Sequence, residues 1–509
     1  MGQEAADRHS TPTPERHGVD TIPEAERTAR PRDLVAILVG ANLGFTNIVF
    51  GWLAVSYGLG LWAALTANIV GTLLGAAFVA PLALVGLRSG TNNSVGSGAY
   101  FGVRGRLIAS VIGVLLSTGF MAVTVWAGGE AIVASLARLV DLPETDGAYA
   151  AGYALLAAAA TLAAVYGFRW IVLLNRLAAP VMTAVIVLGL AAFWTKIDFS
   201  APGDPSAYAL GSFWPTWLLA MVSTGIAGPV SFVTLTGDWT RYISPRRHSG
   251  RAVVRATGLG MVAGLVVPQV FGVLTAVATF DPDAGYVAGL VHAAPAWFLV
   301  PILVCGLVGA LGQSGIVLYS MGLDLDAILP RLSRVASTVL VAATSIGLVF
   351  LGKFVWDAEE SVTTFVLVLT SLATPWAAIT LTGMARTRAR FSEPDLQVFN
   401  RRRRGGAYWY TAGWNLPATV SWVVGSAVGL LSNSSSSFTG PIADLCSGVD
   451  VSFFTSGVAG VVCYLLLTTA VRPRTPAASS EPSEPSEQSE PSATMPPTVT
   501  AEAAGPGRR

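Results

Sequence analysis

Apolar runs of 18 or more residues recur along the whole of this sequence. A helix of about 20 apolar residues rises roughly 30 Å, which is the thickness of the hydrocarbon core of a bilayer. Charged residues make up only 12% of the 509 residues, which is too few for a soluble domain of this size. The sequence therefore predicts an all-α polytopic membrane protein.

Twelve apolar spans can be counted between a polar N-terminal segment and a polar C-terminal tail. Residues 1–33 contain prolines and arginines, residues 471–509 contain the repeat SSEPSEPSEQSEPS, and both segments are predicted to be disordered. Residues 34–470 are predicted to form one membrane domain, with no cleaved signal peptide before it. The twelve predicted spans cover residues 35–56, 61–86, 107–137, 148–167, 170–194, 214–236, 253–280, 294–328, 335–352, 361–384, 411–431 and 449–470.

Lysine and arginine are distributed unevenly between the two sides that these spans define. Of the 31 Lys and Arg residues, all but Arg138, Lys196 and Lys353 fall on the side of the N-terminus. Basic residues flanking membrane helices stay on the cytoplasmic side. Both termini are therefore predicted to be cytoplasmic, in a multi-pass protein of the cytoplasmic membrane.

The sixth span is interrupted at its centre by the sequence Gly225-Ile226-Ala227-Gly228-Pro229. Proline removes a backbone donor and glycine weakens a helix, so the freed backbone groups need partners in the protein or in a water-filled cavity. The first span carries glycines, a threonine and two asparagines where an anchor would carry leucine: Gly40, Asn42, Gly44, Thr46, Asn47 and Gly51. A proline kink and close helix packing are the alternatives, whereas the amides favour a polar binding site.

The two broken spans stand at corresponding positions if the first ten spans form two halves of five. Secondary transporters often contain such inverted halves, with the binding site at mid-membrane between interrupted helices. The sequence therefore predicts a transporter with a 5+5 inverted repeat and two additional C-terminal helices. A channel or receptor-like module is the alternative of another class. No enzyme is predicted, because the sequence has no HExxH or CxxC motif and no evident nucleophile–base pair.

Several motifs together resemble one transporter family. The segment TGDWTRY at residues 236–242 is similar to the D-[FYW]-[ST]-R-[FY] signature that ends the sixth helix of the nucleobase:cation symporter-1 family. Four further segments match the family in order and spacing: GSGAYFGVRGR at 96–106, GFMAVTVWAGGEA at 119–131, YSMGL at 319–323 and GPIADLCSGVDVS around Asp450. The resemblance covers about residues 32–470.

The resemblance implies a LeuT-like inverted repeat of twelve helices and alternating access. It implies cation-driven import of a flat heterocycle such as cytosine, a purine, allantoin or a hydantoin, without choosing among them. The expected partners are this small molecule and the lipid bilayer. No cofactor and no nucleic acid are expected, and no pattern indicates an oligomeric state. An amino-acid carrier on the same fold is the alternative within transport.

In this family the base ring stacks between an aromatic side chain on helix three and another on helix six. Here the helix-three position is Phe120, with Thr124 one turn on, while the helix-six position falls on Pro229 and the nearest aromatic is Phe232. Loss of one stacking face puts the identity of the ligand in doubt, since stacking is worth about 1–3 kcal/mol per base. The predicted ligand site comprises Asn42, Gly44, Phe45, Asn47, Phe120, Thr124, Gly228, Pro229, Ser231, Phe232, Gln313 and Ser314.

The co-transported ion is predicted to be a proton or sodium. Family members that use sodium take carbonyls from helix one, here Gly40 and Leu43, and hydroxyls from helix eight, where this sequence has Gly312 and Gln313 instead. Gln313 offers one amide oxygen, but the hydroxyl pair is missing. Glu130 lies within the third span and is the candidate proton carrier, because carboxyls inside membranes are often proton sites. The proton is therefore favoured.

Two pairs of charged residues lie at the expected cytoplasmic ends of spans. Asp238 and Arg241 are three residues apart on one helix face and are predicted to shape the inner gate, with an exposed ion pair of little energetic weight as the alternative. Asp324 and Asp326 end the eighth span and are expected to be solvated.

Overall fold

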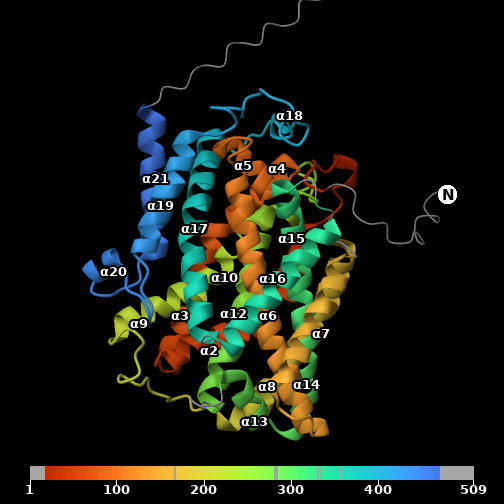
Figure 1. Cartoon of the computed structure of the whole chain (residues 1–509), viewed down its shortest axis with the longest axis vertical. Helices are drawn as coiled ribbons and strands as arrows, with labels where there is room; N and C mark the ends of the chain where they lie inside the picture. The colour runs from red at the N-terminus through yellow and green to blue at the C-terminus, as the bar shows by residue number, and fades with distance from the viewer. Residues whose placement is uncertain are drawn as a thin grey trace, which may run out of the picture. The chain divides into compact units, whose positions relative to one another are not determined.

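The computed structural model describes residues 18–165, 168–279, 285–329, 332, 334–355 and 358–470. The described residues form a bundle of long helices joined by short connections (Figure 1). The helices of the first five spans are α1 (Pro31–Asn42), α2 (Phe45–Ser56), α3 (Leu61–Val79), α6 (Leu107–Val140), α7 (Asp146–Val165) and α8 (Phe168–Phe193). The later long helices are α12 (Gly250–Thr279), α15 (Ala310–Ile328), α16 (Arg334–Phe354), α17 (Ala358–Thr387), α19 (Leu416–Leu431) and α21 (Ser452–Ala470).

Shorter helices complete the spans and their connections. The sixth span consists of α9 (Phe213–Ala220), a π-helical turn (Met221–Ile226, the first π turn), α10 (Ala227–Val230) and, after an irregular stretch, α11 (Thr236–Thr240). The eighth contains α14 (Leu299–Val304) and a second π turn (Cys305–Gly309) before α15. The connections include α4 (Ala83–Ser89), α5 (Asn93–Phe101), α13 (Tyr286–Ala293), α18 (Glu393–Leu396) and α20 (Pro441–Leu445).

Each predicted span has a helical counterpart in the described part of the chain. Eight helices there are long and apolar enough to cross a bilayer, and α1 with α2 forms a ninth such span that bends by 62°. The other predicted spans coincide with α7, with the segment from α9 to α10 and with α19. The fold class is thus an all-helical polytopic membrane protein, as predicted, and the predicted number of twelve is compatible with it.

The last two helices contact the first ten spans mainly through the tenth, α17. α19 packs mainly against α21, and both pack against α17. By contrast, α12 packs against α1, α2 and α3, and α15 packs against α6. This arrangement agrees with two C-terminal helices added to a ten-span core.

Glycines bring the two halves into direct backbone contact where α2 meets α12. A Cβ on Gly51 would collide with the carbonyl oxygen of Gln269, and a Cβ on Gly272 would collide with the carbonyl oxygen of Ile48. Small residues allow helices in membranes to approach closely, and dispersion then supplies the attraction. The contact fixes α2, the second half of the broken first span, against α12.

The prediction that residues 1–33 are disordered is wrong for residues 18–30, which we call the N-terminal strap. The strap lies across one end of the bundle, and its residues Thr28 and Ala29 form β-bridges to Ile243 after α11. Residues 1–17 and the tail at 471–509 lie outside the described residues. The strap was missed because its order comes from partners far away in the sequence.

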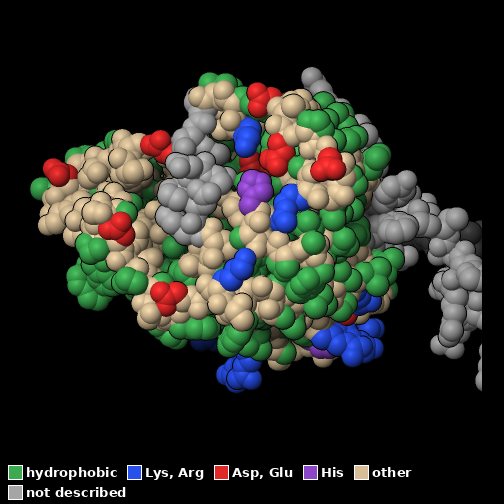
Figure 2. Space-filling model, turned by 90° about the horizontal axis from the view of Figure 1, so that it is seen from below, with side chains coloured by type: hydrophobic (Ala, Val, Ile, Leu, Met, Phe, Trp, Pro, Cys, Tyr) green, Lys and Arg blue, Asp and Glu red, His purple; other side chains and the backbone are tan. Residues whose placement is uncertain are grey.

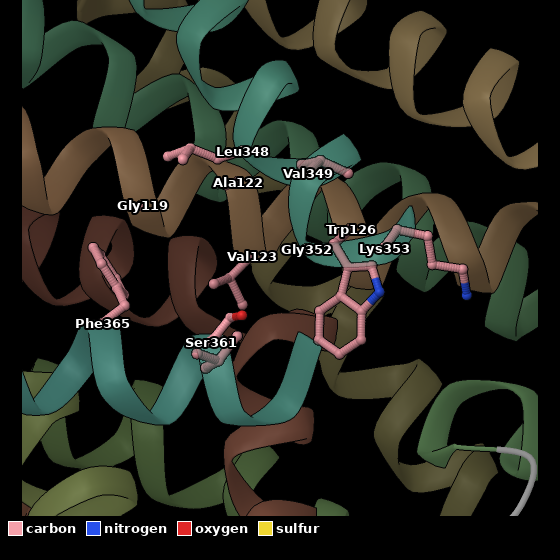
Figure 3. Close-up of a pocket in the computed structure, with 11 residues that line it drawn as sticks. Gly119, Ala122, Val123, Trp126, Leu348, Val349, Gly352, Lys353, Ser361 and Phe365 are labelled. Atoms are coloured by element: carbon pink, nitrogen blue, oxygen red, sulfur yellow. The ribbon is translucent and has the colours of Figure 1, made fainter. Parts of the chain in front are cut away.

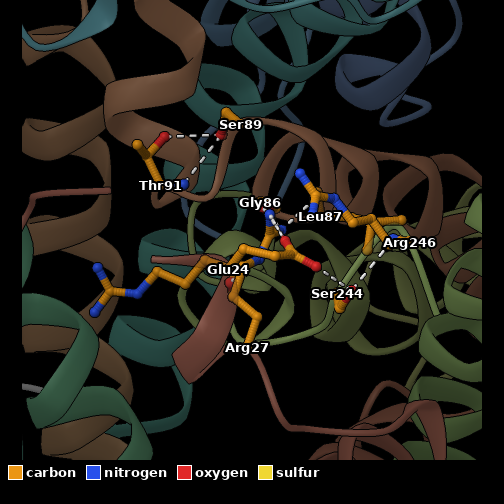
Figure 4. A network of polar contacts seen from close by, with 9 residues as sticks. Glu24, Arg27, Gly86, Leu87, Ser89, Thr91, Ser244 and Arg246 are labelled. Atoms are coloured by element: carbon orange, nitrogen blue, oxygen red, sulfur yellow. Dashed lines mark hydrogen bonds and ion pairs between the residues drawn. The ribbon is translucent and has the colours of Figure 1, made fainter. Parts of the chain in front are cut away.

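Arg27 fixes the strap to the bundle, as Figure 4 shows. Its buried guanidinium donates to the backbone carbonyls of Leu87, at the end of α4, and of Arg241. The Glu24 carboxylate accepts a hydrogen bond from the Ser244 hydroxyl, which lowers the pKa of Glu24 and keeps it ionised. These bonds satisfy carbonyls at helix ends, which have no partner within their own helix.

Different short helices lie at the two ends of the bundle. α4, α5 and α18 lie at the end with the strap, which we call the strap end, while α9, α13 and α14 lie at the far end (Figure 1). Seen from the far end, acidic and basic side chains are interspersed on the face, and apolar side chains gather along the flank of the bundle (Figure 2).

Candidate functional site

The break in the first span is held by amides of the span itself. α1 ends at Asn42 and α2 begins at Phe45. The buried Asn42 amide donates to the Leu38 carbonyl at 2.6 Å, and the buried Asn47 amide donates to the Asn42 carbonyl at 2.8 Å. A carbonyl freed in hydrocarbon needs a partner, so these amides replace hydrogen bonds that the break removes.

The sixth span is broken twice, and amides from other helices reach both places. The Gln269 amide of α12 donates to the Thr224 carbonyl in the first π turn at 2.8 Å. The Asn93 amide of α5 donates at 2.6 Å to the Val233 carbonyl, which lies in the irregular stretch 231–235. Around Pro229 the sixth span therefore departs from a regular α-helix on both sides, with the π turn before α10 and hydrogen-bonded turns after it.

Phe120 and Thr124 of α6 lie beside the break of the first span. The Thr46 hydroxyl, at the start of α2, donates to the Thr124 hydroxyl at 3.0 Å. The Phe120 ring lies between the rings of Phe50 and Phe365, with centroid distances of 6.1 and 5.7 Å. The structure thus brings the predicted helix-three residues to the predicted helix-one residues.

The predicted aromatic and proline residues of the sixth span have partners elsewhere. Ring atoms of Pro229 lie 3.0 Å from the position that a Cβ on Gly75 of α3 would take. The Phe232 ring packs on Trp239 at a centroid distance of 5.8 Å, and the Ser231 hydroxyl donates to a carbonyl of its own helix. Among the described residues, the ring partners of Phe120 are Phe50 of α2 and Phe365 of α17, and none comes from the sixth span.

Carbonyls at the end of α1 face glycines of the eighth span. A Cβ on Gly312 would lie 3.5 Å from the Gly40 carbonyl oxygen and 3.0 Å from the Asn175 amide oxygen. A Cβ on Gly309 would lie 3.6 Å from the Leu43 carbonyl oxygen. Neutral oxygens are ligands that sodium accepts, but α15 adds no hydroxyl pair.

Two neighbouring polar atoms on α15 have no protein partner. The Gln313 amide oxygen and the Ser314 hydroxyl are buried and have no hydrogen-bond partner among the described residues. Buried polar groups are nearly always hydrogen-bonded, so these two atoms are available to a bound molecule or water. All twelve predicted ligand residues are buried: Asn42, Gly44, Phe45, Asn47, Phe120, Thr124, Gly228, Pro229, Ser231, Phe232, Gln313 and Ser314.

A cavity of about 180 Å³ lies next to Phe120, between α6, α16 and α17 (Figure 3). The Phe365 ring lines this cavity and packs against both Phe120 and the backbone at Gly119. The Trp126 indole N–H is buried and has no partner among the described residues. The volume corresponds to about six water molecules at roughly 30 Å³ each, which is enough for a single ring.

Glu130 is held in an ion pair on the rim of this cavity. Its carboxylate accepts from the Lys353 ammonium at 2.5 Å and from the Tyr153 hydroxyl at 3.4 Å. The sequence predicted Glu130 inside the third span but gave no partner for it, and the structure supplies this partner in Lys353. The role of Glu130 in proton coupling stays a prediction, and a paired carboxylate is a poorer candidate than an unpaired one.

The expectation that Asp324 is solvated is also wrong. Its side chain is 2% exposed, and one carboxylate oxygen accepts from the Ser94 hydroxyl of α5 at 2.5 Å. The other oxygen sits where a Cβ on Gly113 of α6 would be. Asp238 and Arg106 are the charged groups close enough to act on it. The Asp326 side chain lies outside the described residues.

Asp238 and Arg241 are fully buried at the strap end, so the alternative of an exposed surface pair is wrong. The Arg241 guanidinium donates to the Tyr319 hydroxyl of α15 at 3.0 Å and to the Gly18 carbonyl of the strap at 2.7 Å. The end of the sixth span is thereby tied to the eighth span and to the strap. Their part in gating stays a prediction.

Three amide residues contribute to this region and were missed in the sequence. Asn93, Asn175 and Gln269 reach the interrupted spans from α5, α8 and α12. Two of them could have been found from the sequence, because Asn175 and Gln269 are amides inside apolar runs. Burying such an amide without hydrogen bonds costs free energy, as it does for Asn42 and Asn47. Asn93 lies between predicted spans, and nothing local marks it.

Residues 21–455 match the family model described as permease for cytosine/purines, uracil, thiamine, allantoin. The putative purine-cytosine permease YxlA of Bacillus subtilis is 22% identical over 471 residues, which cover 90% of this chain and 97% of that protein.

Two solved structures share the fold. One is Mhp1, a nucleobase-cation-symport-1 family transporter, in a closed conformation with bromovinylhydantoin bound; it aligns with a TM-score of 0.70 and 18% identity over 90% of this chain and 95% of its own. The inward-facing conformation of Mhp1 aligns with a TM-score of 0.65 and 19% identity over the same shares.

Proposed function

Because the chain belongs to the family of permeases for cytosine, purines, uracil, thiamine and allantoin, we propose that it imports a flat, single-ring or fused-ring heterocycle across the cytoplasmic membrane together with protons. It is a multi-pass secondary active symporter of nucleobase-like substrates and not an enzyme. The observation that carries the site is the meeting of Phe120 and Thr124 with the break of the first span.

The ligand is proposed to lie on Phe120 between the two broken spans. Thr124, Gln313 and Ser314 offer a hydroxyl, an amide and a second hydroxyl, which suit the alternating donors and acceptors on the edge of a heterocycle. An amino acid would instead need a site for a carboxylate and an ammonium. The test is uptake of labelled purines, pyrimidines, allantoin and hydantoins by a transporter-deficient strain that expresses the chain. Uptake of none of them, with normal expression, would contradict the proposal.

Replacing Phe120 with alanine should weaken binding of the transported heterocycle. Loss of one stacking face costs about 1–3 kcal/mol, which is roughly a 5- to 150-fold rise in Kd. Binding to purified protein measures the effect, and Phe454→Ala is a control because Phe454 of α21 is 44% exposed on the outside of the bundle. Unchanged binding in Phe120→Ala would remove Phe120 from the site.

The coupling ion is proposed to be a proton carried by Asp324. Of the carboxyls within the predicted spans, Glu130 is paired with Lys353, and the buried Asp450 accepts from the backbone N–H groups of Ser434 and Ser452. Asp324 is buried against Ser94 and Gly113, with both an acidic group, Asp238, and a basic group, Arg106, near it. Ionisable groups inside a membrane domain are often parts of proton pathways. The neutral oxygens of Gly40, Leu43 and Asn175 support sodium as the second candidate, since hard cations bind oxygen ligands.

The strap end is proposed to be cytoplasmic, in accordance with the distribution of lysine and arginine. The exposed native Cys446, just after α20, would then face the outside. A membrane-impermeant maleimide should label it in intact cells, and Cys446→Ser should abolish the labelling because Cys305 is buried and Cys463 lies within α21. In the Cys446→Ser background, Arg403→Cys should react only after permeabilisation. Labelling of Arg403→Cys in intact cells would invert the topology.

A further inference from the structure

A second cavity, of about 650 Å³, opens at the strap end between the end of the second span and the start of α12. Its lining combines three arginines, Arg88, Arg251 and Arg255, with the apolar side chains of Pro81, Leu84 and Val254. No Asp or Glu residue is among the lining residues. We propose that this cavity binds the phosphate headgroup of an anionic phospholipid from the adjoining leaflet.

The three guanidiniums come from two separate elements and converge on one space. Arg251 and Arg255 are four residues apart and so share one face of α12. Arg88, in α4, is held in position because its guanidinium donates to the backbone carbonyls of Arg388 and Ala389. A terminal nitrogen of Arg88 lies 4.0 Å from the position of a Cβ on Gly250, the first residue of α12.

The charge of this cluster is not balanced by the protein. Neither Arg251 nor Arg255 has a hydrogen-bond or ion-pair partner within the described part of the chain. Three like charges around one cavity repel each other, so a bound anion stabilises the arrangement. Arginine binds phosphate through paired N–H groups, and the N-terminus of α12 adds a favourable dipole.

The walls distinguish a lipid from a free phosphate. The space corresponds to about 22 water molecules at roughly 30 Å³ each, far more than a phosphate ion needs. Exposed apolar residues follow one to two helical turns further along both helices: Leu73 and Leu74 of α3 and Leu259 of α12 are 48%, 43% and 66% exposed. A phospholipid can place its phosphate on the arginines of the cavity and its acyl chains along these exposed leucines. Basic pockets between membrane helices are typical sites for anionic lipid headgroups.

The lipid site is independent of the transported substrate and goes beyond the proposed function. The orientation of the chain in the membrane decides only which leaflet supplies the lipid. In the proposed topology this is the cytoplasmic leaflet. The site links α4 to α12, and α4 also carries the carbonyls that hold Arg27. Occupancy should therefore stabilise the strap end as a whole.

The test uses the purified full chain in a neutral detergent, with thermal unfolding and native mass spectrometry as readouts. Phosphatidylglycerol should raise the unfolding temperature and appear as a bound adduct, whereas phosphatidylcholine with the same acyl chains, or inorganic phosphate, should do neither. The double variant Arg251→Gln/Arg255→Gln should bind phosphatidylglycerol at least tenfold more weakly. The control Arg403→Gln/Arg404→Gln removes two exposed arginines that do not line the cavity, and it should behave like the wild type.

Three results would overturn the proposal: an equal effect of phosphatidylglycerol on the double variant, an equal effect of phosphatidylcholine on the wild type, or full replacement of the lipid by inorganic phosphate. The last result would identify a site for soluble anions instead. If the double variant does not fold, Arg255→Gln alone carries the same comparison, with Arg404→Gln as its control.

Discussion

An Asp324→Asn variant is expected to lose concentrative uptake driven by a pH gradient, by at least tenfold, while it still folds and binds the heterocycle. Asparagine has nearly the size of aspartate and can still accept the hydrogen bond from Ser94, so the packing against Gly113 is kept. What it lacks is a proton that can be loaded on one side of the membrane and released on the other. Facilitated exchange of labelled substrate across the membrane should therefore survive.

The matched comparison is Glu130→Gln, which removes a second carboxylate within the predicted spans. Because Glu130 is paired with Lys353, which lines the cavity between α6, α16 and α17, its loss should reduce the rate but leave accumulation under a pH gradient in place. Uptake is measured in vesicles with an imposed pH gradient and no sodium, then with a sodium gradient and no pH difference. Wild-type uptake that requires sodium and ignores pH would contradict proton coupling. Two results would contradict the proposal that Asp324 carries the proton. One is normal substrate accumulation by Asp324→Asn; the other is loss of accumulation in Glu130→Gln but not in Asp324→Asn.

The second large effect is expected from a single methyl group. Gly272→Ala should leave little correctly folded transporter, because the new Cβ would overlap the carbonyl oxygen of Ile48 in α2. A backbone atom in a packed helix cannot swing aside as a side chain can. Overpacking of this kind costs about 1–3 kcal/mol or more, against a total stability of roughly 5–15 kcal/mol. Displacement of α2 would also disturb Thr46 and the break of the first span.

Gly347→Ala in α16 is the control for this substitution, since nothing lies within 4 Å of the position of its Cβ. The yield of monodisperse protein and the unfolding temperature report the effect. A Gly272→Ala protein that unfolds at the wild-type temperature would show that α2 and α12 can separate at little cost. If Gly347→Ala behaves like the wild type and Gly272→Ala gives little monodisperse protein, the effect is due to the contact between α2 and α12.

The sequence predicts the helices well because a membrane imposes simple local rules. An apolar run of about 20 residues has few alternatives to a helix, and glycine and proline mark where such a helix is interrupted. That the first and sixth spans depart from regular helices was therefore predicted from local composition alone. The grouping of Phe120 with the first span came from the resemblance to a family.

What the sequence could not supply is the set of partners of the charged residues. Asp324 was expected in water because it ends an apolar run, yet its partner Ser94 is 230 residues away. Glu130 was predicted as a proton carrier with no partner named, and Lys353, 223 residues away, reaches it. No local pattern encodes such pairs, because they result from how helices pack. Pro229 shows the same limit, since its ring faces Gly75 of α3.

The N-terminal strap has a consequence for the timing of assembly. Gln397 donates to the Val19 carbonyl of the strap, although 378 residues separate them. At a synthesis rate of roughly 5–20 residues per second, the ribosome needs about 20–75 s to make this partner after the strap has emerged. The strap, among the earliest described residues to be synthesised, therefore completes its contacts among the last. Until then a nascent chain that already contains most of its membrane helices has a strap end that is not yet covered.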